Sequence, residues 1–136
     1  HPLALSQALH TYLPTSDISR TRLLGLGHSQ YMDTLKDWDY FEQEGPVYFD
    51  GETDRIYESA EPLTLVTPAG KCKLTSVGSD STVVWNPGPE KALRLSDFPG
   101  TGWQKMVCVE TANAATDYRV LNEGQSHTLG VVIGRG

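Results

Sequence analysis

The chain has 136 residues and a mass of 14.9 kDa, and 38% of its residues are hydrophobic. That is enough for one domain with a core, and no apolar run approaches the roughly 20 residues of a membrane-spanning helix. The net charge of −6, from 17 acidic and 11 basic residues, argues against nonspecific attraction to nucleic acid or anionic lipid. We therefore expect neither nucleic acid nor membrane among its partners.

Short apolar segments of strand length alternate with turn signals along the chain. They span residues 4–13, 22–26, 47–49, 55–57, 63–66, 71–77, 82–85, 104–110 and 127–133. Helical periodicity is nearly absent. The exception is a helical turn at residues 90–96, with Pro89 in its first turn and Leu93 packed inward. Acidic and aromatic side chains interleave at residues 37–44, which predicts a solvated loop. The pattern indicates an all-β protein, an antiparallel sandwich or barrel in one domain.

The two cysteines, Cys72 and Cys108, lie in strand-like runs and belong to no CxxC pair or Cys/His cluster with metal-ligand spacing. A structural zinc site is therefore not expected, and the sequence nominates no metal ligand. A disulfide between the two is open from sequence, but two reduced, buried thiols are favoured. Reduced thiols predict a cytoplasmic location.

Two side chains that can transfer protons lie within apolar, strand-like runs. His10 belongs to ALHTY at residues 8–12, and Glu110 belongs to MVCVET at residues 106–111. Strand alternation allows both to face one concave sheet surface. A histidine, with an unperturbed pKa of about 6.5, exchanges protons near neutral pH, so the pair indicates acid-base chemistry. The alternative is that His10 hydrogen-bonds a neighbour in the core and Glu110 marks a solvated strand end.

Further motifs stand in a consistent order between these two. They are GLG at residues 25–27 followed by YMD at 31–33, TDRIY at 53–57 and VVWNPGP at 83–89. Together with the runs around His10 and Glu110, they resemble the glucose-6-phosphate 1-epimerase family, the hexose-6-phosphate mutarotases of the galactose-mutarotase-like superfamily. The likeness runs through nearly the whole chain.

The resemblance implies an enzyme that interconverts the α and β anomers of a hexose 6-phosphate, glucose 6-phosphate first among them. It implies that Glu110 removes the proton of the anomeric hydroxyl while protonated His10 donates to the ring oxygen. Ring opening, rotation about C1–C2 and reclosure then exchange the anomers. Such a reaction needs one base and one acid on opposite sides of the anomeric centre, and no metal or redox cofactor.

Three further residues are candidate sugar contacts. Asp54 resembles the family's aspartate that hydrogen-bonds sugar hydroxyls, although it could be a loop acid paired with Arg55 in solvent. Trp85 could stack on a pyranose, with Asn86 reaching a hydroxyl; equally, Trp85 could close a core and Asn86 shape the Asn-Pro turn. The dispersed lysines and arginines nominate no phosphate clamp.

The resembled family has a large β-sandwich, the galactose-mutarotase-like supersandwich, in a chain about twice as long. Residues 1–136 would thus form the carboxy-terminal part of a single sandwich domain. A partial sandwich leaves unpaired strand edges and an uncovered apolar face. We expect a truncated chain, a separate amino-terminal half, or pairing with a second copy.

Two other functions remain open. The chain could be a noncatalytic carbohydrate-binding β-sandwich module, since fold does not determine function, or a relic that retains the motifs without closing the site. The matched acid and base favour the enzyme over the binding module.

Overall fold

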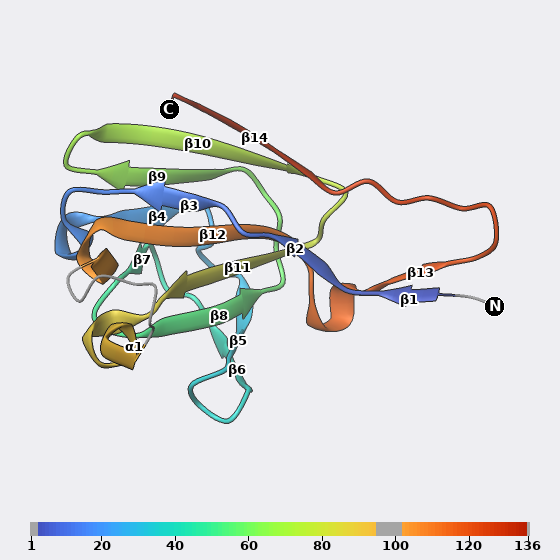
Figure 1. Ribbon diagram of the computed structural model, residues 1–136, viewed down its shortest axis with the longest axis horizontal. Coiled ribbons are helices and arrows are strands. Elements are labelled where there is room, and N and C mark those ends of the chain that lie inside the picture. Colours follow the sequence, from blue (N-terminus) through green and yellow to red (C-terminus); the bar gives the residue numbers. More distant parts are fainter. Residues whose placement is uncertain (1–2, 95–101, 136) are drawn as a thin grey trace.

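The computed structural model describes residues 3–94 and 102–135. Nearly all of their regular structure is strand, in two stacked sheets with a two-stranded ribbon extending from them (Figure 1). The strand pairs among these residues are antiparallel throughout. The predicted all-β, antiparallel sandwich is confirmed.

The larger sheet runs in the order β2-β12-β11-β8-β5-β6, and β3 pairs with β12 next to β2. Its strands are β2 (Gln7–Leu9), β3 (Tyr12–Pro14), β12 (Met106–Asn113), β11 (Ser81–Asn86), β8 (Thr53–Tyr57), β5 (Gln30–Asp33) and β6 (Asp39–Glu42).

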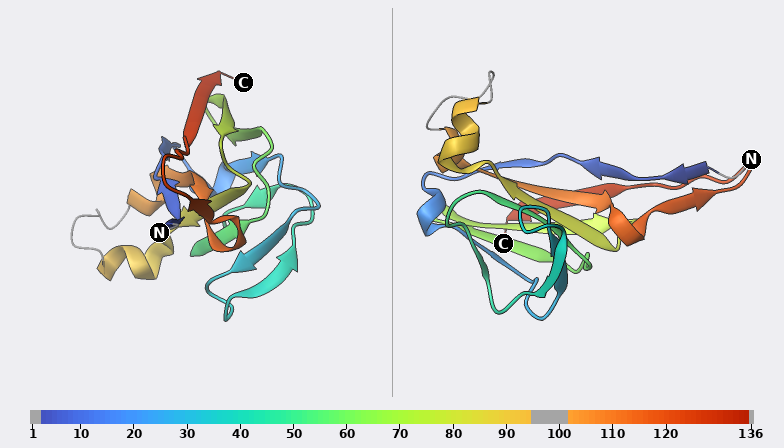
Figure 2. Two further views of the ribbon diagram at one scale, coloured as in Figure 1. Left: turned by 90° about the vertical axis from the view of Figure 1, so that its right-hand side faces the viewer. Right: turned by 90° about the horizontal axis from the view of Figure 1, so that it is seen from below.

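The smaller sheet runs in the order β14-β10-β9-β4-β7. Its strands are β14 (Gly130–Arg135), β10 (Gly70–Val77), β9 (Leu63–Thr67), β4 (Arg22–Leu24) and β7 (Val47–Tyr48). The ribbon pairs β1 (Leu3–Leu5) with β13 (Arg119–Leu121) and projects beyond the sandwich, which Figure 2 shows from below.

Helices are short. The α-helix α1 spans Gly88–Arg94, and the 3₁₀ turns are η1 (Ile18–Arg20), η2 (Gly102–Lys105) and η3 (Ala115–Asp117). Among residues 3–94 and 102–135, no helix has the length and apolar character needed to cross a membrane.

The hydrophobic core lies between the two sheets. Fully buried side chains of the larger sheet meet fully buried side chains of the smaller one. They are Tyr57, Val84 and Val107 on one side and Leu23, Val47 and Leu65 on the other. Because strand neighbours alternate between faces, Val83 and Trp85 flank the core residue Val84 but lie half-buried on the outer face. That outer face carries the candidate site.

The structure corrects several predicted elements. The strand predicted at residues 4–13 is three strands, β1, β2 and β3, and His10 lies in the break between the last two. Residues 37–44 contain strand β6 rather than only a loop, because Phe41 stacks on Tyr31 of β5 with ring centroids 5.7 Å apart. The strands β5 and β13 were not predicted.

The helix predicted at residues 90–96 starts two residues earlier, at Gly88, and Pro89 lies in its first turn as expected. Ser96 and the predicted packing of Leu93 lie outside what the structure describes. Gly88 has φ +68°, and a Cβ there would lie 2.6 Å from the backbone nitrogen of Glu52. Glycine at this position therefore lets the turn after β11 approach the neighbouring loop.

Candidate active site

His10 and Glu110 stand opposite each other on antiparallel strands. Leu9 pairs with Thr111 in the β2–β12 ladder, and Tyr12 pairs with Cys108 in the β3–β12 ladder. This common register places residue 10 across from residue 110. The N–H of Thr11 donates to the carbonyl of Leu9 over 3.0 Å, which makes a tight turn centred on His10 and interrupts the strand there.

The two side chains are in direct contact, His10 Nδ1 to Glu110 Oε1. Glu110 is only 8% exposed at its side chain, whereas His10 is 68% exposed. Burial raises the pKa of the Glu110 carboxyl, the charge of His10 lowers it in part, and Asp54 adds to the rise. The site therefore pairs the buried carboxyl of Glu110, whose raised pKa makes its carboxylate a stronger base, with the exposed imidazole of His10.

A second row of side chains crosses the same face beside this pair. Asp54 pairs with Trp85 across β8 and β11, Trp85 pairs with Cys108 across β11 and β12, and Cys108 pairs with Tyr12. The predicted aspartate and tryptophan thus lie on neighbouring strands beside His10 and Glu110.

A pocket of about 270 Å³ opens over these residues. Its lining consists of His10, Tyr12, Asp54, Trp85 and Glu110. Four of the five predicted site residues thus line one pocket, although they come from three strands and the turn between β2 and β3. Tyr12 was not nominated from the sequence, but it shares a strand face with His10, and that alternation could have identified it.

Asp54 is a half-buried carboxylate on this face. Burial raises its pKa, and Thr34 and the charge of Lys91 oppose that rise in part. An acid of this kind, next to an indole and facing a pocket, can accept hydrogen bonds from hydroxyl groups of a ligand. It makes no salt bridge with Arg55, whose guanidinium contacts the Asp33 carboxylate at 3.8 Å.

Asn86 does not line the pocket. Its side chain is 1% exposed, and its Nδ2 donates to the carbonyls of Trp103 and Met106, each at 2.8 Å. Its Oδ1 accepts from the N–H of Gly88 at 2.9 Å. These bonds join the end of β11 to η2 and α1, which is the turn-shaping alternative considered for this residue.

Both cysteines are free, as predicted, but only Cys108 is buried, whereas Cys72 is partly exposed. Cys108 is 1% exposed beside Glu110 on β12, and burial, reinforced by Glu110, raises the pKa of its thiol to about 12. The thiol is therefore a poor nucleophile.

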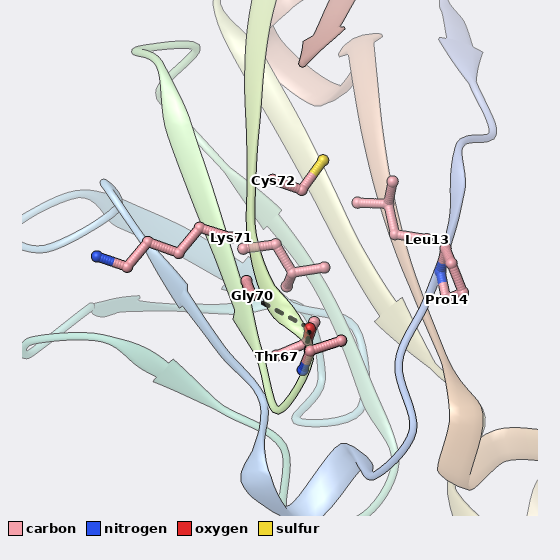
Figure 3. A pocket seen from close by; sticks show the side chains of 8 residues that line it. Leu13, Pro14, Thr67, Gly70, Lys71 and Cys72 are labelled. Atoms are coloured by element: carbon pink, nitrogen blue, oxygen red, sulfur yellow. Dashed lines mark hydrogen bonds between the residues drawn. The ribbon is translucent and has the colours of Figure 1, made fainter. Parts of the chain in front are cut away.

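A second pocket, of about 250 Å³, opens between the two sheets beside β3 and the β9–β10 hairpin. Figure 3 shows Cys72 on one side of it and Leu13 on the other, with the amine of Lys71 directed away from both. The lining has no acid-base pair: Leu13, Pro14, Leu65, Thr67, Ala69, Gly70, Lys71 and Cys72. It is an opening of the core rather than a reaction site.

The aldose 1-epimerase family model matches residues 1–134. A Cenchrus ciliaris protein is 36% identical over 115 residues, which cover 82% of this chain and 35% of that protein. An Escherichia coli K12 protein is 31% identical over 126 residues, which cover 90% of this chain and 42% of that one. Both bear the provisional name glucose-6-phosphate 1-epimerase.

Solved structures agree with this assignment. A provisionally assigned mutarotase from Salmonella typhimurium has a TM-score of 0.86 and 25% identity, over 99% of this chain and 47% of that one. A provisionally assigned aldose 1-epimerase from Escherichia coli K12 has a TM-score of 0.70 at 14% identity, which shows the fold alone. The chain spans less than half the length of the curated relatives described above. Matched from residue 1 to residue 134, it belongs to the aldose 1-epimerase family.

Proposed function

We propose that this chain carries the acid-base centre of a hexose-6-phosphate mutarotase, with glucose 6-phosphate as the first candidate substrate. The observation that carries the proposal is the direct contact of His10 Nδ1 with Glu110 Oε1 in a pocket also lined by Asp54 and Trp85. The provisional names of the Cenchrus and Escherichia relatives support the choice of substrate.

The chemistry assigns one proton transfer to each residue. Glu110, ionised, takes the proton from the anomeric O1 hydroxyl, and His10, protonated, donates to the ring oxygen as the C1–O5 bond breaks. The open aldehyde rotates about C1–C2. Glu110 then returns its proton to O1 while His10 removes the proton from the O5 hydroxyl during closure on the other face. Both residues end in their starting protonation states, and the reaction is redox-neutral.

The local geometry suits this pair of transfers. O1 and the ring oxygen are both bonded to C1, so the acid and the base must reach neighbouring atoms. The contacting side chains of His10 and Glu110 meet that requirement. Burial raises the pKa of Glu110 and so makes its carboxylate a stronger base towards the hydroxyl.

The other pocket residues supply binding. Trp85 offers an apolar surface on which a pyranose can stack, and Asp54 can accept hydrogen bonds from hydroxyl groups. The pocket lining contains no lysine or arginine. We place the phosphate contacts in a further segment of the kind that the longer relatives possess. The two free thiols support a reducing, cytoplasmic location.

NMR exchange spectroscopy tests the proposal. The α and β anomers of glucose 6-phosphate give separate signals, and their cross-peaks should build up faster with the protein, including any further segment, than with buffer. Equal build-up with and without protein, across several hexose phosphates, would refute the mutarotase and favour the noncatalytic sugar-binding module.

A further inference from the structure

The thiol of Cys108 has no part in the proposed proton transfers, yet it belongs to the same cluster. One ligand atom each from His10, Cys108 and Glu110 lies within 4.8 Å of the other two. His10 lies 98 positions before Cys108 (108 − 10), so no local spacing could have revealed the whole group. Their proximity follows from the β3–β12 and β2–β12 register.

The three residues of the cluster differ in burial. Cys108 and Glu110 are two residues apart on β12 and share one strand face, with the thiol 1% and the glutamate 6% exposed. His10 lies opposite at the mouth, where its side chain is 68% exposed. Glu110 Oε1 is buried and, apart from its contact with His10, has no hydrogen-bond partner among residues 3–94 and 102–135.

Among the described residues, the exposed His10 ring alone holds the buried Oε1 of Glu110, so a cation can take the place of the proton between them. The donor set is one sulfur, one imidazole nitrogen and one carboxylate oxygen, which suits the borderline-soft Zn²⁺ better than Mg²⁺ or Ca²⁺. Tetrahedral zinc bonds of about 2.0–2.3 Å separate ligand atoms by roughly 3.3–3.6 Å. The ligand atoms of the cluster lie within 4.8 Å of one another, and rotation of the exposed His10 ring can bring its nitrogen to the separation that zinc requires.

We propose that His10, Cys108 and Glu110 form a binding site for one thiophilic divalent cation, with Zn²⁺ as its type. Three protein ligands leave a fourth position open towards the pocket, where water completes the coordination. Binding replaces the proton between His10 and Glu110 and releases the thiol proton of Cys108 to solvent, since a ligating cysteine is a thiolate.

A cation bound at this site should inhibit anomer exchange, and this consequence rests on the proposed function. Once the imidazole lone pair and the carboxylate bind metal, neither group can exchange a proton with a sugar. Zn²⁺ should therefore block anomer exchange and compete with sugar for the pocket. The buried thiol beside the acid-base pair would make the enzyme sensitive to free zinc.

Cobalt spectroscopy tests the site without reference to activity. Tag-free protein is titrated with Co²⁺, and a thiolate-to-cobalt charge-transfer band in the near-ultraviolet should appear at one equivalent. The band should be absent in Cys108→Ser and retained in Cys72→Ser, since Cys72 is the other free thiol and lies outside the cluster. Zn²⁺ affinity measured by competition should fall in Cys108→Ser by more than the roughly 10–100-fold that loss of an outer-shell partner costs.

Glu110→Gln provides a second variant in case Cys108→Ser fails to fold. It leaves the thiol in place and removes the carboxylate ligand, so Zn²⁺ affinity should again drop beyond that range. A cobalt spectrum without a thiolate band, or equal Zn²⁺ affinity in wild type and Glu110→Gln, would overturn the site.

The outcomes also separate this site from the proposed function. A thiolate band together with no anomer exchange by the metal-free protein would refute the mutarotase and leave the metal site intact. Anomer exchange by a protein that shows no thiolate band would refute the metal site and leave the mutarotase intact.

Discussion

Asp54 lies directly across from Trp85 in the β8–β11 ladder, on the sheet face that also bears the contact between His10 and Glu110. The proposed hydroxyl acceptor, the proposed stacking surface and the proposed acid-base pair thus occupy adjoining positions, although they come from distant parts of the chain. The pairing register accounts for this arrangement, because a shift of one residue in any strand would turn its side chain to the core.

The first prediction concerns the base. Glu110→Gln keeps the size of the side chain and removes its ability to accept a proton, so turnover should fall by roughly 10²–10⁴-fold while sugar affinity persists. Exchange spectroscopy and a sugar titration measure the two quantities separately. Glu61→Gln, at an exposed position away from the pocket, is the matched control. Wild-type turnover in Glu110→Gln would transfer the role of base to another group, Asp54 first.

The same variant should also change stability, with a sign set by the pKa of Glu110. Burial raises this pKa in the folded protein, so the folded state binds the proton more tightly than the unfolded state does. The contribution of Glu110 to stability is therefore greatest at low pH and is lost as pH rises through its folded pKa. Glu110→Gln should be more stable than wild type at neutral pH, and the difference should shrink on acidification.

Urea unfolding midpoints of the two proteins from about pH 4 to about pH 7 would measure this difference. Asp54 also has a raised pKa, and its charge acts on Glu110, so the measured difference includes the coupling between these two carboxyls. A less stable Glu110→Gln at neutral pH would show that the contact with His10 outweighs the cost of burying the carboxylate.

Asn86→Ala tests whether this residue is a sugar contact or a turn-former. The variant leaves the carbonyls of Trp103 and Met106 without their amide donor, so the free energy of unfolding should fall by about 1–3 kcal/mol. Sugar affinity of the folded fraction should stay near wild type. Asn122→Ala, at an exposed asparagine, is the control. Lost sugar affinity with unchanged stability would instead establish the hydroxyl contact.

Much of this site could be predicted from strand alternation and family resemblance, which indicated that His10 and Glu110 can face one surface. Other features could not be predicted. The turn at His10 depends on pairing with β12, which local sequence does not contain. Strand β6 resembled a loop because its charged and aromatic residues give no apolar alternation, and its pairing with β5 overrides that pattern. The position of Cys108 beside His10 likewise depends on register.

The absence of lysine and arginine from the pocket lining predicts weak discrimination for phosphate by residues 1–136 alone. The lining carries two carboxylates, Asp54 and Glu110, and no lysine or arginine. In this lining only His10 could give a phosphate ester a charge-assisted hydrogen bond, and Glu110 already contacts it. Calorimetric titration should show glucose 6-phosphate binding no more tightly than glucose, with added salt improving only the phosphate ester. Tight, phosphate-dependent binding would show that this chain contains its own phosphate site.

The last prediction concerns the uncovered edge of the smaller sheet. Strand β14 ends the sheet order, and Val132 and Ile133 on it are 64% and 46% exposed. An apolar strand with an unpaired edge is a template for another strand. We expect residues 1–136 alone to self-associate, and Val132→Lys to shift the protein towards monomer, because a charge at an edge opposes strand pairing without disturbing the core.

Sedimentation velocity over a range of concentrations measures this shift. Ser126→Lys adds the same charge in the exposed loop before β14 and should leave the association unchanged. A longer protein that includes the further segment of its relatives should sediment as a smaller assembly than residues 1–136, since that segment would cover the edge in place of a second copy. A monodisperse monomer of residues 1–136 at all concentrations would show that this part of the fold is complete on its own, and that the exposed edge of β14 is tolerated as an ordinary sheet edge.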